Sequence, residues 1–169
     1  LRSYSLYLET TDKVAAAEAD SAWSANRREA MALLVREAEL EELVRLVGVD
    51  ALPASDRLVM LGARMIREDF LHQNAFDATD TDTSRKKQCL MLRNILDFYR
   101  HAREAFEKGA DVLEMAKLPV LEDITRAKYI AEDDLGKFDG ILEKACRELD
   151  GLSAAKGEES QETETGKPT

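Results

Sequence analysis

The spacing of apolar residues constrains the fold of this chain more than any other feature, because such residues recur every three or four positions over most of its length. This is the period of an α-helix, and no convincing run alternates apolar and polar residues as a β-strand would. The first periodic stretch runs from Asn26 to about Val47, and Gly48 supplies a C-terminal stop. Its apolar positions are Ala30, Leu33, Leu34, Leu40, Leu43, Val44 and Val47. The pattern predicts an all-α fold.

A second periodic stretch starts at Pro53, which suits the first position of a helix because its missing N–H needs no partner there. The two stretches predict a helical hairpin with residues 48–52 at its tip. The apolar stripe of the second helix is Leu58, Leu61, Met65, Ile66 and Phe70, and its polar face bears Arg57, Arg64, Arg67 and Glu68.

A third helix is predicted after the polar loop at residues 77–83, with Thr83 or Ser84 as its N-cap. It runs to about Lys108 and stops at Gly109. One face carries Cys89, Leu92, Ile95, Tyr99, Ala102 and Phe106. This face is expected to be the core of the bundle.

Two shorter helices and a long one complete the prediction. The short ones are expected at residues 111–117 and from Pro119 onward. The last helix carries Leu135, Phe138, Leu142, Ala145 and Leu149, which step by three and four. Few apolar residues occur from Ser153 on, so this tail is predicted to be disordered.

The length of 169 residues and the hydrophobic content of 44% fit one domain with one core. We expect a connecting segment at residues 1–24, a helical domain at 25–152 and a disordered acidic tail at 153–169. Because the chain starts at Leu1 and shows no signal peptide, it is interpreted as a piece of a longer protein.

The charge balance excludes some partners. The chain has 24 Lys and Arg against 34 Asp and Glu, a formal charge of −10, which would repel nucleic acid. No stretch approaches the roughly 20 apolar residues of a membrane span, so no insertion into a bilayer is expected. Cys89 and Cys146 lie far apart without a CxxC motif, which indicates reduced thiols of a cytosolic protein.

Catalytic motifs are missing. No GxxxxGK[ST] phosphate loop occurs, because the pairs Gly136-Lys137 and Gly166-Lys167 lack the upstream glycine and the following hydroxyl residue. The chain therefore cannot cradle a triphosphate by itself. There is also no GxSxG or HExxH, so no catalytic residue is predicted.

Metal ligation is not expected either. Asp69 precedes His72 by three positions and Asp97 precedes His101 by four, but neither pair matches the Glu-x-x-His motif of di-iron bundles. Both histidines are interpreted as ordinary helix residues.

Two charged runs could face partners. The run Glu37–Leu43 is interpreted as the solvated face of the first helix, with weak pairs to Arg36 and Arg45. The basic cluster Arg85, Lys86 and Lys87 is interpreted as exposed by chance rather than placed for an acidic partner, since it opposes the helix dipole.

Four segments, Ser3–Tyr7, Arg28–Pro53, Ala63–Ser84 and Leu118–Ile130, closely resemble the C-terminal region of the catalytic A subunit of V-type and archaeal-type ATPases. The resemblance spans roughly residues 3–150, and runs such as REDFLHQNAF and LVGVDALP are too long to be chance. It implies an upstream core that carries the phosphate loop and uses ATP and Mg²⁺. The helical domain alone should then bind no cofactor and be inactive.

The resemblance also implies partners and a location. They are the alternating B subunits of a heterohexamer and the central-stalk subunits, in a peripheral complex on the cytoplasmic face of a membrane that translocates H⁺ or Na⁺. Composition and periodicity alone also permit a free-standing helical adaptor that binds a partner helix. A phosphate loop in the coding sequence upstream of Leu1 would decide between the two.

The hairpin tip is the expected central-stalk contact. The related F-type beta subunit carries an acidic DELSEED segment at this turn, which leans on the rotating shaft. The corresponding residues here are Asp50, Ala51, Leu52, Pro53, Ala54, Ser55 and Asp56. Because only the first and last are acidic, steric or apolar pushing through Leu52 and Pro53 is favoured over a charge-driven contact.

The run Gln73, Asn74, Ala75 and Phe76 resembles the place where the family's domain reaches the bound nucleotide and an aromatic ring lines the adenine pocket. Phe76 is the matching residue. From the residues alone, Phe76 would be interpreted as a core side chain that closes the second helix, because buried Phe is the common case. The resemblance implies an adenine contact instead.

Overall fold

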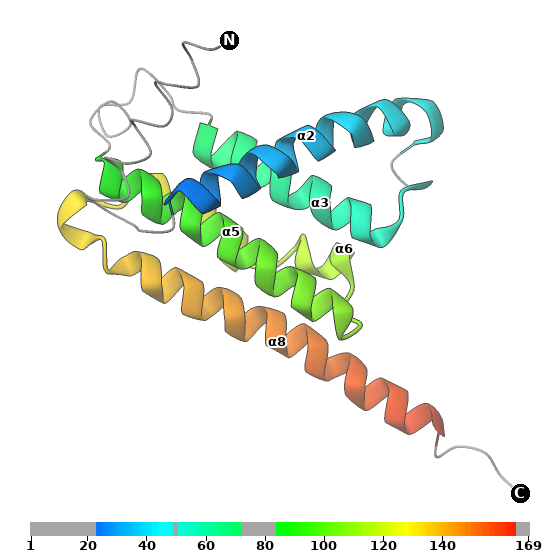
Figure 1. Cartoon of the computed structure of the whole chain (residues 1–169). Helices are drawn as coiled ribbons and strands as arrows, with labels where there is room; N and C mark the ends of the chain where they lie inside the picture. Colours follow the sequence, from blue (N-terminus) through cyan, green and yellow to red (C-terminus); the bar gives the residue numbers. More distant parts are fainter. Residues whose placement is uncertain (1–22, 49–50, 72–83, 165–169) are drawn as a thin grey trace, which may run out of the picture.

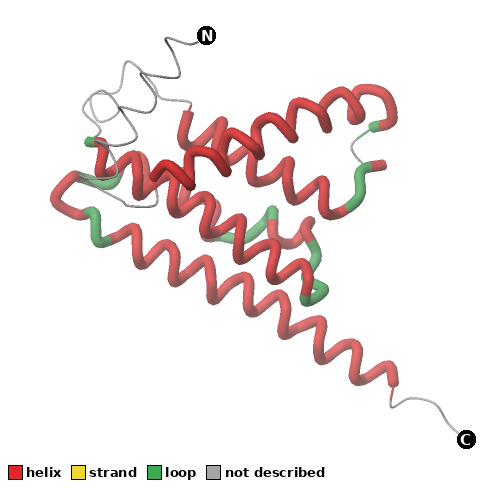
Figure 2. Tube along the Cα trace, viewed as in Figure 1, coloured by secondary structure: helices red, strands yellow, loops and turns green. Residues whose placement is uncertain are grey.

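The computed structural model describes residues 23–48, 51–71 and 84–164, with side chains described to residue 154. Over these residues the chain is a bundle of helices without a strand (Figure 2), which confirms the predicted all-α class. In chain order the elements are α2 (Trp23–Val47), α3 (Ala54–Met65), η2 (Ile66–Leu71), α5 (Arg85–Glu107), α6 (Val112–Met115), α7 (Val120–Arg126), η3 (Ala127–Tyr129), η4 (Glu132–Asp134) and α8 (Lys137–Glu164).

The predicted hairpin is formed by α2 and α3, which lie side by side (Figure 1). Gly48 ends α2 with a φ of 84°, a left-handed conformation that residues with a Cβ rarely adopt. Pro53 lies at the N-cap of α3 rather than at its first position. The stripe predicted for α3 faces the core, because Leu58, Leu61 and Met65 are all buried.

The second helix of the hairpin changes its winding before it ends. The sequence predicts a continuous α-helix through Phe70, whereas the α-helix α3 stops at Met65 and continues as the π-helix η2 from Ile66 to Leu71. Segments of π-helix occur often at functional sites. Here η2 packs against α2, α5 and α7, so the wider turn lies where four elements meet.

Helix α5 is the central element and packs against α2, α3 and α8 (Figure 1). Ser84 caps its N-terminus as predicted, and its side chain accepts a hydrogen bond of 3.1 Å from the Lys87 N–H. Gly109 follows its C-terminal end with a φ of 97°. Every residue of the predicted apolar face is buried except Phe106, which packs against the core from its edge.

Two apolar clusters hold the bundle together. The larger one joins residues of α2, α3, η2, α5, α6, α7 and α8. The smaller one has Met91, Ala127 and Phe138 at its centre, with Phe70, Leu90, Ile130, Leu135 and Ile141 packed around them. It lies between the end of η2, the start of α5 and the start of α8.

The last helix is longer than predicted. Its backbone is helical to Glu164, whereas the sequence predicts disorder from Ser153. The extension leaves the rest of the bundle at its C-terminal end (Figure 1). Alanine, glutamate, lysine and glutamine dominate this stretch, and these residues favour a helix even where no apolar face is available for packing.

Two charged side chains for which the sequence predicts exposure to solvent, Glu37 and Lys87, are buried instead. Glu37 is 4% exposed, and its carboxylate accepts a hydrogen bond from Arg67 of η2. Lys87 is 1% exposed, and its Nζ donates to the backbone oxygen of Lys128 at 2.6 Å. The expected solvated face of α2 and the expected exposure of the basic cluster are therefore wrong at these two positions.

Candidate functional site

The residues expected at the nucleotide, Gln73, Asn74 and Phe76, lie outside the described part of the chain. The structure does describe the elements on either side, η2 up to Leu71 and α5 from its cap at Ser84. These two elements pack against each other. The described residues closest in sequence to the candidate nucleotide site are therefore the end of η2, here called the η2 flank, and the start of α5, here called the α5 flank.

The α5 flank is fixed by Glu132 of η4. The carboxylate of Glu132 accepts hydrogen bonds from the Ser84 N–H at 2.9 Å and from the Ser84 hydroxyl at 2.7 Å. Burial acts to raise the pKa of Glu132, but these two hydrogen bonds and the charges of Lys87 and Lys86 outweigh it and hold the pKa below its ordinary value. Glu132 thus favours its charged form at neutral pH.

The η2 flank carries a half-buried acid, Asp69. Burial raises the pKa of this carboxyl, helped by the charge of Glu68, although Thr125 of α7 and the charges of Lys128 and Arg64 act in the opposite direction. Lys128 therefore bears on both flanks, because its charge acts on Asp69 and its backbone oxygen accepts the bond from Lys87.

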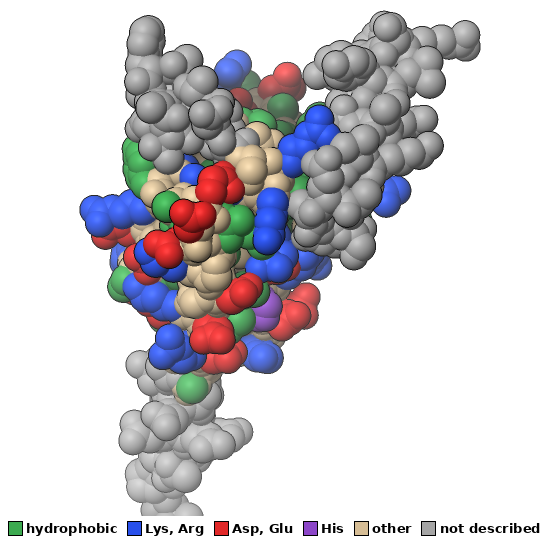
Figure 3. All heavy atoms as spheres, turned by 90° about the vertical axis from the view of Figure 1, so that its left-hand side faces the viewer, with side chains coloured by type: hydrophobic (Ala, Val, Ile, Leu, Met, Phe, Trp, Pro, Cys, Tyr) green, Lys and Arg blue, Asp and Glu red, His purple; other side chains and the backbone are tan. Residues whose placement is uncertain are grey.

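The surface of this end of the bundle carries charges of both signs. Acidic and basic side chains lie next to each other on the face that contains the end of η2 and the start of α5 (Figure 3). Capture of a polyphosphate needs a concentrated positive potential. The mixture of charges on the described part of this face therefore favours contact with another protein surface instead.

At the hairpin tip the described residues differ in their exposure. Ala51, Pro53, Ala54 and Ser55 are exposed, whereas Leu52 is buried at 4% exposure. The expectation of apolar pushing through Leu52 is therefore corrected, because this side chain packs into the domain and Pro53 remains as the exposed apolar group. Asp50 lies outside the described residues.

The other acid of the tip is already engaged within the hairpin. Asp56 is half-buried and pairs with Arg36 of α2 at 3.4 Å, and Arg36 also pairs with Glu39 at 2.8 Å. In addition, the Arg57 Nε donates to the backbone oxygen of Leu52 at 3.0 Å. These contacts tie the start of α3 to α2 and to the turn.

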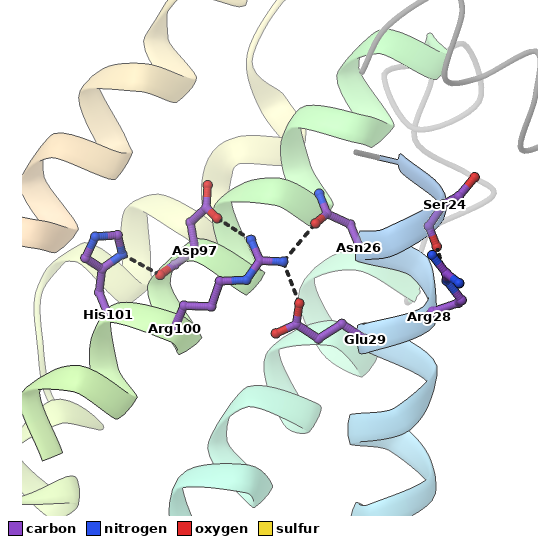
Figure 4. Close-up of polar contacts among 7 residues, drawn as sticks. All are labelled: Ser24, Asn26, Arg28, Glu29, Asp97, Arg100 and His101. Atoms are coloured by element: carbon purple, nitrogen blue, oxygen red, sulfur yellow. Dashed lines mark hydrogen bonds and ion pairs between the residues drawn. The ribbon is translucent and has the colours of Figure 1, made fainter. Parts of the chain in front are cut away.

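A second polar network joins the other end of α2 to α5. Arg100 reaches from α5 to Glu29 and to Asn26, whose side-chain oxygen lies at 2.9 Å (Figure 4). Its other arm bonds Asp97 at 2.6 Å. The His101 Nδ1 contacts the backbone oxygen of Asp97 at 2.8 Å rather than its carboxylate, so these two residues do not form a ligand pair.

A groove of about 290 Å³ lies between α3 and α6. Its wall includes Met60, Leu61 and Val112, and its rim includes Arg64. The two other charged residues at the α2 side, Glu37 and Arg67, already pair with each other. The groove therefore offers an apolar wall with Arg57 and Arg64 beside it and no constellation of catalytic groups.

The described residues contain no group of three or more His, Cys, Asp or Glu side chains that could hold a metal ion. Among the helices in the described ranges, none combines the length and the apolar composition needed to span a bilayer.

The sequence profile of the C-terminal domain of V and A type ATP synthase matches residues 12–116. The chain belongs to this family. Similarity to V-type ATP synthase alpha chains extends further: those of Thermoanaerobacter pseudethanolicus and Clostridium perfringens are each 49% identical over 90% and 93% of the chain. The corresponding chain of the A-type ATP synthase of Thermococcus sibiricus, its A subunit, is 46% identical over 94% of it. The chain spans about a quarter of the length of these relatives, 26% of the first and 27% of the others.

The family assignment confirms the resemblance seen in the sequence. The profile of the ATP synthase C-terminal domain covers the hairpin and α5, and the relatives also cover much of the chain beyond Ala116. Sequence reasoning missed Glu132, Lys87 and Arg100 as structural contacts. Of these contacts, only the Asp97–Arg100 pair could have been suggested by local sequence, through its i,i+3 spacing. The Lys87–Lys128, Ser84–Glu132 and Asn26–Arg100 contacts join residues 41 to 74 positions apart.

Proposed function

We propose that this domain couples nucleotide binding in the catalytic subunit of a V- or A-type ATP synthase to rotation of the central stalk. The observation that carries the proposal is the 49% identity to a V-type ATP synthase alpha chain over 90% of this chain. In this proposal ATP and Mg²⁺ act in a nucleotide-binding core of the full subunit, and the present sequence, which has no phosphate loop, does not hold them by itself.

The hairpin supplies the mechanical part of this function. From Ala54 to Leu71, α3 and η2 follow one another without a break between the shaft-facing tip and the nucleotide-facing segment. At 1.5 Å per residue, the rise of an α-helix, α3 alone is roughly 18 Å long, and η2 extends it further. The Arg36–Asp56 and Arg67–Glu37 pairs connect the start of α3 and the start of η2 to the neighbouring residues Arg36 and Glu37 in the middle of α2.

The partners follow from the same assignment. Catalytic subunits alternate with B subunits in a heterohexamer, and the tip meets the central-stalk subunits. The assembly is a peripheral, cytoplasmic part of a membrane-bound complex that translocates H⁺ or Na⁺. The tip contact is steric and is made through the exposed residues Ala51 and Pro53, since Leu52 is buried.

Deletion of residues 50–54 in the reconstituted complex tests the proposal. The deletion should uncouple ATP hydrolysis from ion transport while nucleotide binding stays intact, because the tip is the end of the hairpin remote from the nucleotide. The measurement is the number of ions transported per ATP hydrolysed in proteoliposomes. The matched control is the double change Asp50→Asn and Asp56→Asn, which should alter coupling little, because Arg36 already engages Asp56.

A normal transport ratio in the deleted complex would refute the coupling role of the tip. A large effect of the double Asp→Asn change would instead restore a charge-driven contact.

A further inference from the structure

The groove between α3 and α6 joins buried core residues to an exposed leucine. Leu61 and Val112 line the groove and are buried. Leu113, the next residue of α6, also lines it but is 52% exposed. The short helix α6 lies beside α3 and buries Val112 and Met115, which leaves Leu113 at the groove (Figure 1). A hollow of about 290 Å³ next to an exposed leucine is a place where a large apolar side chain of another molecule can leave water.

The charged side chains that line the groove are three arginines and one glutamate. Arg57 and Arg64 belong to α3, and Arg67 belongs to η2. The glutamate, Glu37 of α2, is buried and already pairs with Arg67. The groove therefore has a positive excess on a chain whose formal net charge is −10.

Arg67 is neutralised within the domain and does not carry this excess. Besides its pair with Glu37, its guanidinium lies 3.9 Å from the carboxylate of Glu41 and 3.8 Å from that of Glu68. The excess positive charge of the groove thus comes from the two arginines of α3.

The two arginines of α3 are placed differently. Arg64 is exposed, and among the described residues it forms no hydrogen bond or ion pair. Its charge acts on Asp69, where it opposes the rise in pKa that burial causes. The Arg57 side chain is half-buried and is held by the hydrogen bond of 3.0 Å from its Nε to the Leu52 backbone oxygen. Arg57 is thus fixed in place, and the Arg64 guanidinium is accessible to an acid from outside the domain.

The spacing of these arginines fits a helix as the ligand. Arg57 and Arg64 are seven residues apart, close to two helical turns, so they lie on one face of α3 about 10 Å apart along its axis. Met60, which also lines the groove, comes between them. On a second helix, two acids seven positions apart have the same separation, and an apolar residue three or four positions from each acid shares their face.

We propose that this groove binds an acidic amphipathic helix of another subunit of the ATP synthase. One apolar side chain of that helix enters between α3 and α6, and two carboxylates seven positions apart face Arg57 and Arg64. The planar guanidinium of arginine suits a carboxylate, which it can bind through two parallel hydrogen bonds. The mode is that of an amphipathic helix in an apolar groove. The inference rests on the proposed function, because it takes the partner from the same assembly.

A polyanion is a poorer occupant than a helix. A polyphosphate or a nucleic acid backbone could meet the two arginines, but it has no apolar group to cover Met60 and Leu113. An acidic amphipathic helix satisfies the charges and covers the apolar wall at the same time.

The test places the photoreactive amino acid p-benzoylphenylalanine at position 113, in place of Leu113, in the catalytic subunit of the assembled ATP synthase. Irradiation should link it to a helix of another subunit, and mass spectrometry should find two acids seven positions apart around the linked residue. If this variant does not assemble, Ala116, which is exposed and lines the same groove, carries the probe instead.

Four results of the crosslinking would overturn the proposal. They are the absence of a crosslink, a crosslink to a second copy of the catalytic subunit, one to another segment of the same subunit, and one to a segment without the two acids.

Charge reversal distinguishes recognition by the arginines from mere proximity. Arg64→Glu should lower the crosslink yield about tenfold, because an acid would then face an acid. Changing the facing acid of the partner to lysine should restore the yield. Arg64→Gln, which only removes the charge, should lower it about two- to threefold.

Arg126→Glu is the matched control, because Arg126 of α7 is exposed and pairs with Glu122 at 2.6 Å outside the groove. This change should leave the crosslink yield as it is in the parent. Equal yields in Arg64→Glu and the parent, or equal losses in Arg64→Glu and Arg126→Glu, would overturn the proposal.

The failure of this proposal differs from the failure of the proposed coupling function. If deletion of residues 50–54 uncouples transport but the probe at position 113 finds no acidic helix, coupling through the tip stands and the groove contact is rejected. If the probe finds the helix and the deletion leaves the transport ratio normal, the groove contact stands and coupling through the tip is rejected.

Discussion

Gly62 of α3 lies against the ring of Tyr99 of α5, and this contact makes a residue with any side chain costly at that position. A Cβ added to Gly62 would lie 2.7 Å from the Tyr99 Cδ2, and the ring is only 6% exposed and has little room to move. We expect Gly62→Ala to lower the free energy of unfolding by about 1–2 kcal/mol, because overpacking outweighs the gain in helix propensity.

Gly151 of α8 is the matched control, because a Cβ added there meets nothing within 4 Å. Gly151→Ala should stabilise the domain by about 0.5–1 kcal/mol through helix propensity alone. Urea unfolding of both variants measures the two values. Equal effects of the same sign would show that the Tyr99 contact does not limit the approach of α3 to α5.

The Glu37–Arg67 pair predicts an asymmetry between its two partners. Glu37 is buried, whereas the Arg67 side chain is 45% exposed and stays hydrated when it loses its partner. Arg67→Ala should therefore destabilise the domain by about 2–3 kcal/mol, because it leaves a buried carboxylate without its guanidinium. Glu37→Leu should cost less than about 1 kcal/mol, because an apolar side chain suits the buried position. A larger loss in Glu37→Leu than in Arg67→Ala, measured by urea unfolding, would contradict this.

The burial of Glu37 could not be read from the sequence. The run Glu37–Leu43 contains four glutamates, and helical spacing makes them equivalent candidates for a solvated face. Which of them is covered depends on where η2 crosses α2, and that position is set by packing between distant segments. Sequence periodicity recovers the apolar face of a helix, but a buried ion pair depends on tertiary geometry.

At the scale of secondary-structure elements, the cap of α5 predicts a pH dependence. The pKa of Glu132 is held below its ordinary value in the folded domain. The folded state therefore gains stability above the ordinary pKa, about 4.5 for a glutamate, and loses it as the pH falls through the lower folded pKa. Glu132→Gln should have a lower melting temperature than the parent at pH 7, and the difference should shrink below about pH 4. A difference that stays constant from pH 7 to pH 3 would argue against a charged cap.

The helix ends were predictable where a single residue determines them. Gly48 and Gly109 adopt the positive φ that ends a helix, and Ser84 caps α5 as its position before a periodic stretch indicates. The π-helical winding of η2 was not predictable, because it follows from the meeting of α2, α5 and α7 rather than from the local residues. Beyond Ser153 the backbone of α8 is helical to Glu164; the low apolar content of this stretch predicts disorder, whereas most of its residues favour a helix.

At the scale of the whole molecule, the domain connects its two proposed contacts through different kinds of structure. The shaft-facing tip lies at the end of a two-helix hairpin that ion pairs tie together. The segment proposed to reach the nucleotide follows η2, whose Phe70 packs against the small apolar cluster. The sequence indicated both proposed contacts through the family resemblance, but it did not indicate the contacts of the α7–α8 turn (residues 127–136) with the start of α5, because these join residues more than 40 positions apart.

The isolated domain should fold without the rest of the ATP synthase and should not hydrolyse ATP. Its larger core joins residues of α2, α3, η2, α5, α6, α7 and α8, so a strongly helical circular dichroism spectrum with a cooperative melt is expected. The chain lacks the phosphate loop that would hold the γ-phosphate and the metal, and the adenine contact alone forms one wall of a pocket. Its nucleotide affinity should therefore be weaker than about 1 mM, some 4 kcal/mol of binding free energy. Calorimetric titration with Mg-ATP measures this affinity, and the full-length catalytic protein is the positive control. Binding clearly tighter than this limit would mean that the domain holds a complete nucleotide site of its own. It would contradict the proposal that the core binds the nucleotide and this domain adds only one wall of the pocket.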